Sequence, residues 1–194
     1  VGVTGNLVYT GITESWQDDG IWDDEETIPN NERNGYRLPS IKEWEYAARF
    51  IGTEEPHDEA LASQYISRNV RDGHNDLTEG YYWTPADYAS GAMMDYNIET
   101  ETRMVAWYHG DPLMGGSDKI MPVRQKNANQ LGIYDMSGNV NEWCFSQDGS
   151  GNRVYRGGAF STVSSGYTWW LGFWYANAPN TRSSDTGFRI ARTK

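Results

Sequence analysis

Apolar residues recur at helical spacing most clearly in the segment RLPSIKEWEYAARF. The residues on the apolar face are Ile41, Trp44, Ala47 and Ala48. Ser40 stands just before this face, and Glu43 follows it by three residues, which is the order of a capping box. The pattern predicts a helix from Ser40 to Arg49, with Glu43, Glu45 and Arg49 on a solvated face.

The rest of the chain shows short and irregular patterns. RVYRGG and TGFRIAR have the composition of short strands, and LGIYDMSGNVNEWCFS predicts a turn at Gly138 and Asn139 between apolar flanks. YYWTPADYASG and MVAWYHG have no strong period and predict long loops interrupted by short strands, while the acidic residues 17–32 predict a solvated loop. This pattern indicates a single α+β domain over residues 1–194, built of small twisted sheets with much irregular loop.

Composition and charge narrow the classes of partner. With 194 residues and a formal net charge of -11, the chain lacks the clustered Lys and Arg that nucleic acid requires, so no nucleic-acid partner is expected. No apolar run is long enough to span a bilayer, so direct membrane insertion of this chain is not expected. A single cysteine, Cys144, excludes a disulfide within the chain and a cysteine-based zinc site. His57, His74 and His109 lack the spacing of a metal site or a catalytic triad.

The segment from Tyr155 to Ala191 indicates binding more than catalysis. It contains no Lys, Glu, Gln, Met, His or Cys and is rich in Tyr, Trp, Ser, Gly and Asn. Tyr and Trp offer large rigid contact areas, and Ser, Gly and Asn adapt their hydrogen bonds to a partner. The expected ligand is a protein or a glycan, because Trp and Tyr also stack on the faces of sugars.

Three motifs occur in order along the chain: GYRLPSIKEWEYAAR, LGIYDMSGNVNEWC and RVYRGGAF…TGFRIAR. In order and spacing they resemble the sulfatase-modifying, formylglycine-generating enzyme family over residues 35–192. The resemblance implies a C-type-lectin-like fold. Residues 1–34 do not resemble the start of the family domain and are interpreted as a divergent or trimmed N-terminal part that begins at Val1.

The resemblance does not extend to the chemistry of the family oxidases. Those enzymes bind copper through a pair of cysteines in the segment after the RGG motif, where this chain reads RGGAFSTVSSGYTWWLGFW. Cys144 lies upstream of that segment and is interpreted as a small buried hydrophobic residue. A soft Cu(I) site needs thiolate ligands. The chain is therefore predicted to have no catalytic residues and to require no cofactor.

The same scaffold is shared by the variable proteins of diversity-generating retroelements, and the chain resembles that group, most of all its Treponema type. In these systems template adenines are replaced at random, so AAC codons become NNC, which cannot encode Lys, Glu, Gln, Met or Trp. The absence of the first four residue types between Tyr155 and Ala191 is what this mechanism implies. Trp169, Trp170 and Trp174 are then constant platform residues within a variable region of residues 153–191.

The resemblance assigns a variable ligand-binding surface to the C-terminal segment. Its residues are Tyr155, Ala159, Phe160, Ser161, Thr162, Ser164, Ser165, Tyr167, Trp169, Trp170, Phe173, Trp174, Tyr175, Asn177, Asn180, Ser183, Ser184 and Asp185. Tyr167 and Tyr175 are expected to be exposed, since their hydroxyls need water or a partner. For the three tryptophans of the segment, surface recognition and partial burial are both open.

Other residues of the motifs are expected to build the scaffold. Those that match the family frame are Arg156, Gly157, Gly158, Gly187, Phe188 and Arg189. The tryptophans expected in the core, because they sit inside scaffold motifs, are Trp44, Trp83, Trp107 and Trp143.

The motif DMSGNVNE carries a candidate calcium site. In the resembling family a calcium ion takes a side chain at the position of Asp135, backbone carbonyls at Gly138 and Val140, and the carboxylate of Glu142, and oxygen ligands suit calcium. The alternative is a turn in which Asp135 and Glu142 accept backbone N–H groups. A calcium ion here would be structural.

Motifs and composition together predict a non-catalytic ligand-binding protein that displays a diversified C-terminal surface and is the product of a diversity-generating retroelement. Two alternatives remain open: a carbohydrate-binding lectin-like domain of fixed specificity, and a divergent oxidase of the formylglycine-generating type. The expected location is the bacterial cell surface after export, with the signal or lipid anchor outside this chain.

Overall fold

The computed structural model describes residues 35–55, 57, 65–67, 80–83, 89–92, 99–110, 116–162 and 174–193. The predicted loop of residues 17–32 and His74 lie outside these ranges. The helices are α1 (Ile41–Arg49) and α2 (Glu99–Val105). The strands are β1 (Gly35–Arg37), β2 (Phe50–Gly52), β3 (Tyr65–Ser67), β4 (Tyr81–Trp83), β5 (Asn141–Gln147), β6 (Arg153–Arg156), β7 (Trp174–Asn177), β8 (Thr186–Phe188) and β9 (Ala191–Thr193).

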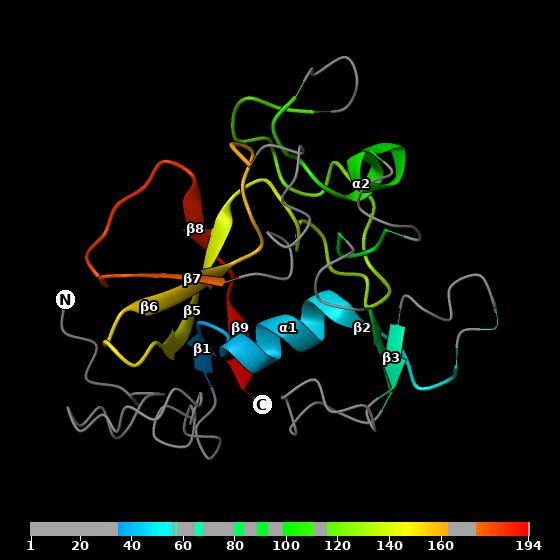
Figure 1. Ribbon diagram of the computed structural model, residues 1–194, viewed down its shortest axis with the longest axis horizontal. Helices are drawn as coiled ribbons and strands as arrows, with labels where there is room; N and C mark the ends of the chain where they lie inside the picture. The colour runs from blue at the N-terminus through cyan, green and yellow to red at the C-terminus, as the bar shows by residue number, and fades with distance from the viewer. Residues whose placement is uncertain are drawn as a thin grey trace.

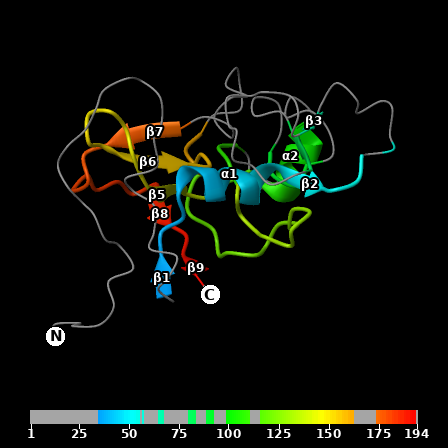
Figure 2. The same cartoon turned by 90° about the horizontal axis from the view of Figure 1, so that it is seen from below.

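The strands form three small sheets (Figure 1). They are a two-stranded sheet β1-β9, a three-stranded sheet β2-β4-β3 and a four-stranded sheet β7-β6-β5-β8. In the last of these, β5, β6 and β7 are antiparallel, whereas β8 runs parallel to β5. Figure 2 shows β1 and β9 extending together away from the four-stranded sheet. The expected α+β class, with small sheets and much irregular loop, is confirmed.

Helix α1 has the predicted limits and the predicted cap. The Ser40 hydroxyl oxygen accepts a hydrogen bond from the Glu43 N–H at 3.2 Å, and the Glu43 carboxylate accepts one from the Ser40 N–H at 2.9 Å. The apolar face of the helix packs against the four-stranded sheet. The resulting core cluster contains Ile41, Trp44, Ala48, Met136, Cys144 and Val154. Cys144 is fully buried in this cluster, as predicted.

The prediction of a solvated face on α1 is wrong for Glu45 and Arg49, because both side chains are buried. Their carboxylate and guanidinium form an ion pair one helical turn apart. Arg156 of β6, also buried, donates to the same carboxylate at 3.2 Å, and Arg49 Nε donates to the Trp83 carbonyl at 2.7 Å. A second layer of chain therefore covers this side of the helix, and the charges are retained inside because they are paired with one another.

Two expectations for the middle of the chain have opposite outcomes. The segment MVAWYHG, predicted as loop, begins inside α2, so the loop prediction is wrong for Met104 and Val105. The predicted turn is confirmed, since Gly138 and Asn139 have φ angles of 72° and 63°. A Cβ on Gly138 would lie 2.2 Å from the Trp107 carbonyl oxygen, so the close approach of the two backbones requires glycine.

Neither α1 nor α2, the helices of the described residues, has the length and apolar character needed to cross a membrane.

Candidate functional site

The four-stranded sheet has a buried face toward α1 and an outer face. Successive side chains of a strand point to opposite faces. Along β6, Val154 and Arg156 are buried while Tyr155 between them is half-exposed. Along β7, Trp174 and Ala176 pack against the core cluster, so Tyr175 between them lies on the outer face. The strand period thus separates the residues that build the scaffold from those available to a ligand.

Strand register places aromatic residues side by side across the outer face. Tyr175 of β7 pairs with Tyr155 of β6, Tyr155 pairs with Trp143 of β5, and Trp143 pairs with Phe188 of β8. The rings of Tyr155 and Tyr175 stack with centroids 5.6 Å apart. Trp143 makes an edge contact with Tyr155 at 5.1 Å. We name these four residues the aromatic row. It crosses all four strands of the sheet.

Polar groups surround Tyr155 at the centre of the outer face. Asn177, which is exposed, donates from Nδ2 to the Tyr155 hydroxyl at 3.3 Å. Burial and the negative charge of Asp185 raise the pKa of Tyr155, so its hydroxyl keeps its proton at neutral pH. The phenol can therefore donate one hydrogen bond to a ligand while it accepts from Asn177.

Asp185 holds a second group of polar side chains together. It accepts hydrogen bonds from the hydroxyls of Ser161 at 3.0 Å, Thr186 at 3.2 Å and Ser183. Burial acts to raise the pKa of Asp185, but the bonds from Ser183, Ser161 and Thr186 outweigh it and lower the pKa. We name Ser161, Ser183, Asp185 and Thr186 the Asp185 cluster. It links the turn after β6 to the loop before β8.

The structure brings together many of the residues that the sequence assigned to the ligand-binding surface. The members found half-exposed or exposed on the outer face, in the turn after β6 or in the loop between β7 and β8 are Tyr155, Phe160, Ser161, Thr162, Tyr175, Asn177, Asn180, Ser183, Ser184 and Asp185. Ser164, Ser165, Tyr167, Trp169, Trp170 and Phe173 lie outside the described residues.

The assignment of Ala159 to that surface is wrong, and of the two alternatives left open for Trp174 the structure shows partial burial. Ala159 is fully buried, because its backbone folds inward in a tight turn where its N–H donates to the Thr162 hydroxyl at 2.9 Å. Trp174 packs on the core cluster, because its place on β7 alternates with that of Tyr175. Ala159 is therefore inaccessible to a ligand, and Trp174 supports the sheet from its core side.

Sequence reasoning missed two residues of the outer face. Trp143 was expected in the core, yet it is only half-buried and lies in the aromatic row. Phe188 was expected to be structural, yet 68% of its surface is exposed. The alternation in NEWC carries the signal for Trp143, since Glu142 and Cys144 on either side of it are buried and face the opposite way.

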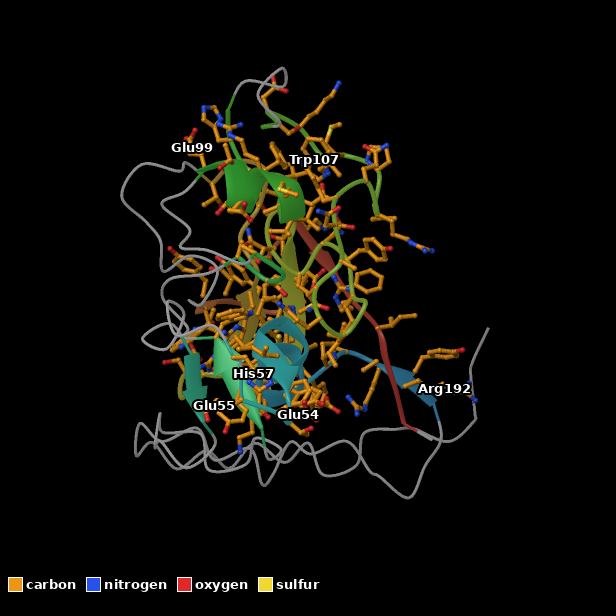
Figure 3. The ribbon with its side chains drawn as sticks, turned by 90° about the vertical axis from the view of Figure 1, so that its right-hand side faces the viewer. Glu54, Glu55, His57, Glu99, Trp107 and Arg192 are labelled. Atoms are coloured by element: carbon orange, nitrogen blue, oxygen red, sulfur yellow. The ribbon has the colours of Figure 1, made fainter. Side chains whose placement is uncertain are left out.

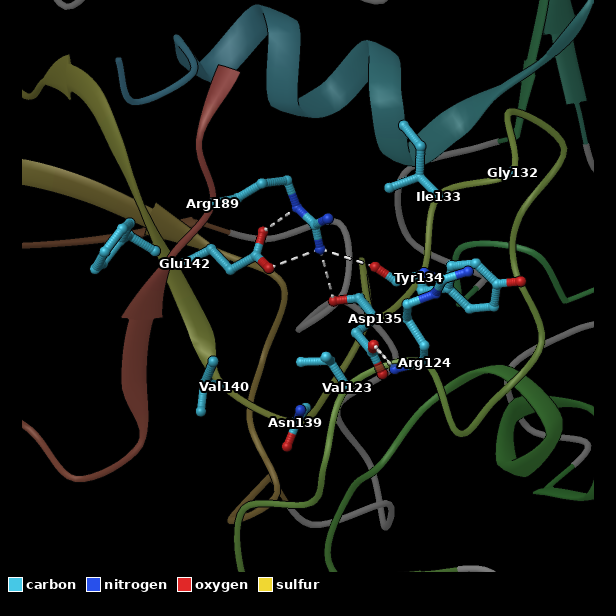
Figure 4. A pocket seen from close by; sticks show the side chains of 11 residues that line it. Val123, Arg124, Gly132, Ile133, Tyr134, Asp135, Asn139, Val140, Glu142 and Arg189 are labelled. Atoms are coloured by element: carbon cyan, nitrogen blue, oxygen red, sulfur yellow. Dashed lines mark hydrogen bonds and ion pairs between the residues drawn. The ribbon is translucent and has the colours of Figure 1, made fainter. Parts of the chain in front are cut away.

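Glu142 lies on the buried face of the same sheet, at a pocket of about 610 Å³ beside β8 (Figure 4). One of its oxygens accepts from Arg189 Nη2 at 2.8 Å, and the other accepts from Arg189 Nε at 3.0 Å and from the Trp44 indole N–H at 2.8 Å. Arg189 also donates to the carbonyls of Tyr134 and Asp135. Burial raises the pKa of Glu142, while Arg189 opposes that effect.

This arrangement does not fit the predicted calcium site. A calcium ligand needs free oxygen lone pairs, whereas both oxygens of Glu142 accept from the Arg189 guanidinium. The Asp135 carboxylate accepts from the Arg124 N–H at 2.7 Å. Calcium at Asp135, Gly138, Val140 and Glu142 therefore stays a prediction that the geometry of Glu142 argues against.

No cluster of three or more His, Cys, Asp or Glu that could hold a metal occurs within the described ranges. Figure 3 places His57, with Glu54 and Glu55, at one end of the view and Trp107 at the other. Trp107, expected in the core, is half-buried, and Lys126 Nζ lies 3.7 Å from its ring centroid. His57 and Trp107 thus lie apart from each other in the structure. The aromatic row, together with the Asp185 cluster, is the candidate site.

The chain is similar in sequence to one known protein and in structure to another. The chain is 30% identical over 177 residues to a Paenibacillus barcinonensis protein named chaperone protein LppX, and covers 53% of it. Its structure is similar to Treponema denticola variable protein 1, with a TM-score of 0.55 and 26% identity, over 86% of this chain and 50% of that one. The chain thus spans about half the length of both.

The match to a protein family is more extensive than the match to either relative. Residues 11–194 fit the family described as sulfatase-modifying factor enzyme 1-like domain. The resemblance drawn from the three motifs is confirmed, and with it the C-type-lectin-like fold of the formylglycine-generating type. This chain belongs to the sulfatase-modifying factor enzyme 1-like domain family.

Proposed function

We propose that this chain is a non-catalytic binding domain whose ligand lies on the outer face of the four-stranded sheet, and that a diversity-generating retroelement varies the residues of that face. One observation carries the proposal. Positions that the sequence assigned to the variable surface, from two segments of chain, converge on one surface: Tyr155 and Ser161 from the first, Tyr175, Asn177 and Asp185 from the second.

The relatives support a binding role. The similar Treponema protein is named a variable protein, and the similar Paenibacillus protein is named a chaperone. Both names are compatible with recognition of a partner without a chemical reaction. Export to the bacterial cell surface is part of the same proposal, and labelling of intact cells with an antibody against the chain tests it.

The oxidase alternative has less support from the residues. Cys144 is the one cysteine in the chain, and it is fully buried in the core cluster beneath β5. A buried thiol in apolar surroundings is a poor nucleophile and a poor metal ligand. Oxygen consumption with a cysteine-containing peptide and copper would favour the oxidase over the binding domain.

A lectin of fixed specificity is the second candidate, since aromatic side chains also bind sugars. The aromatic row is compatible with it. A glycan array separates the two, because a fixed lectin binds the same glycan whatever the sibling sequence, whereas a diversified domain does not.

Amplicon sequencing of the 3′ end of the gene across many isolates tests the diversification directly. We expect substitutions at the codons of Tyr155, Tyr175 and Asn177, which face outward. The matched controls are the alternating positions Val154 and Ala176, which face the core and should stay constant. Equal variation at outward and inward positions, or none at either, would refute the proposal.

A further inference from the structure

We infer that Trp143 and Phe188 form a constant half of the binding surface, shared by every variant, and that the ligand of the whole surface is a protein. The inference rests on the proposed function. It adds constant binding residues and a class of partner to it.

Codon type and the family motif together separate the aromatic row into two halves. Trp143 on β5 lies upstream of the variable region, and no NNC codon encodes Trp. Phe188 on β8 lies in the GFR frame that the family motif retains. Tyr155 and Tyr175, on β6 and β7, are of a residue type that NNC codons can encode. The sheet therefore carries two fixed aromatic strands beside two diversified ones.

The exposure of Phe188 is the structural mark of a binding residue. Full burial of a phenylalanine contributes about 1.5–3 kcal/mol, and this scaffold leaves 68% of its surface in water. Phe188 is the register partner of Trp143, which pairs with Tyr155, so Phe188 extends the aromatic row onto β8. Exposed contiguous apolar surface rimmed by polar groups marks interaction sites.

The geometry of the rings favours a protein over a sugar. A pyranose stacks on a free ring face, but the Tyr155 ring is already stacked with Tyr175 and in edge contact with Trp143. The hydroxyl of Tyr155 is the part left to a ligand, beside the Asn177 amide. Aromatic anchors within a rim of hydroxyl, amide and carboxylate groups are the usual composition of a protein-binding surface.

The test uses the full chain with NNC codons at the outward positions 155, 161, 175, 177, 183, 184 and 185, displayed on yeast and selected against hen egg-white lysozyme as the probe. In each independent binder, Phe188→Ala and Trp143→Ala should each weaken binding about tenfold, the loss typical of an interface anchor. Tyr36→Ala is the matched control, because Tyr36 is 67% exposed and lies on β1, in the separate β1-β9 sheet. It should change affinity less than about twofold.

The results separate three claims: the diversified binding surface, its constant half and its protein ligand. If no binder emerges from a folded library, the diversified binding surface itself is refuted. If binders emerge but tolerate Phe188→Ala and Trp143→Ala in most cases, the constant half is refuted while the proposed function stands. If the wild-type chain binds a printed glycan and the library yields no lysozyme binder, the protein ligand is refuted. Thermal unfolding of each variant, with Trp143→Phe as a second substitution, separates lost contact from lost fold.

Discussion

The carboxylate of Glu142 and the guanidinium of Arg189 form a two-point ion pair between β5 and the end of β8, with bonds of 2.8 and 3.0 Å. Glu142 is buried, and Arg189 also reaches the carbonyls of Tyr134 and Asp135. The pair therefore ties the last strand of the sheet to the DMSGNVNE turn. It links two motifs that are far apart in the sequence.

Substitution of Arg189 should show how much this ion pair contributes to the stability of the fold. Arg189→Gln leaves the buried carboxylate of Glu142 without its cation, and we expect a loss of about 2–4 kcal/mol in the free energy of unfolding. Urea denaturation at pH 7 measures it. Arg182→Gln, at an exposed position, is the control and should change stability by less than about 0.5 kcal/mol. The double variant Arg189→Gln/Glu142→Gln should lose less than the sum of the two single variants, and strict additivity would contradict the pairing.

Removal of divalent cations should leave stability unchanged, because Arg189 and Trp44 already occupy three of the four lone pairs of the Glu142 carboxylate and Arg189 neutralises its charge. An ion at a hundred times its Kd stabilises the fold by about 2.7 kcal/mol, which for a chain of this size raises Tm by about 5–10 °C. Thermal unfolding in EDTA and in millimolar CaCl2 measures the difference. A rise of that size in calcium would restore the calcium site and overturn the interpretation of Glu142.

The stability contribution of Asp185 should depend on pH. Its pKa is lowered in the fold from the ordinary value of 3.8, so the contribution is complete above that pH and is lost as pH falls through the lowered value. The bonds from Ser161, Ser183 and Thr186 suggest about 0.5–1 kcal/mol for this half-exposed group.

Unfolding of the wild type and of Asp185→Asn between pH 7 and pH 3 measures this contribution. The two should differ at pH 7 and converge in acid. Asp118→Asn, which removes an exposed carboxylate elsewhere, is the control. A difference that grows on acidification would contradict the assignment.

Gly138 and Gly132 form a matched pair for the turn that positions Glu142. Their φ angles are 72° and 73°, but a Cβ at Gly138 would overlap the Trp107 backbone, whereas nothing lies within 4 Å of one at Gly132. Gly132→Ala should cost only the left-handed conformation, about 1–2 kcal/mol. Gly138→Ala adds an overlap of about 1–3 kcal/mol. Urea denaturation compares the free energy of unfolding of the two variants. Equal losses would show that the Trp107 backbone moves aside without loss of stability.

Features that depend on a few neighbouring residues could be predicted from the sequence. Ser40 and Glu43 close a capping box on their own helix, and Gly138 and Asn139 adopt the turn that their residue types favour. Three ordered motifs placed the chain in its family. The predictions for the cap and the turn succeeded because backbone preference is a property of short segments. The residues assigned to the variable surface include Tyr155, Tyr175 and Asp185, which the fold brings to one surface; that they bind a ligand stays a prediction.

The side of the sheet or helix that faces the core was set by contacts between distant segments. Glu45 and Arg49 are charged residues of the kind usually found on the surface. They are buried because they form an ion pair with each other and because Arg156 of β6 forms a second ion pair with Glu45. Trp143 has the character of a core residue, yet it lies outward because α1 covers the opposite face of β5. The polarity of a side chain sets its preference for water or for the core. Which side chains are buried is decided by the packing of α1 on the C-terminal sheet, because burial depends on which segments cover a residue.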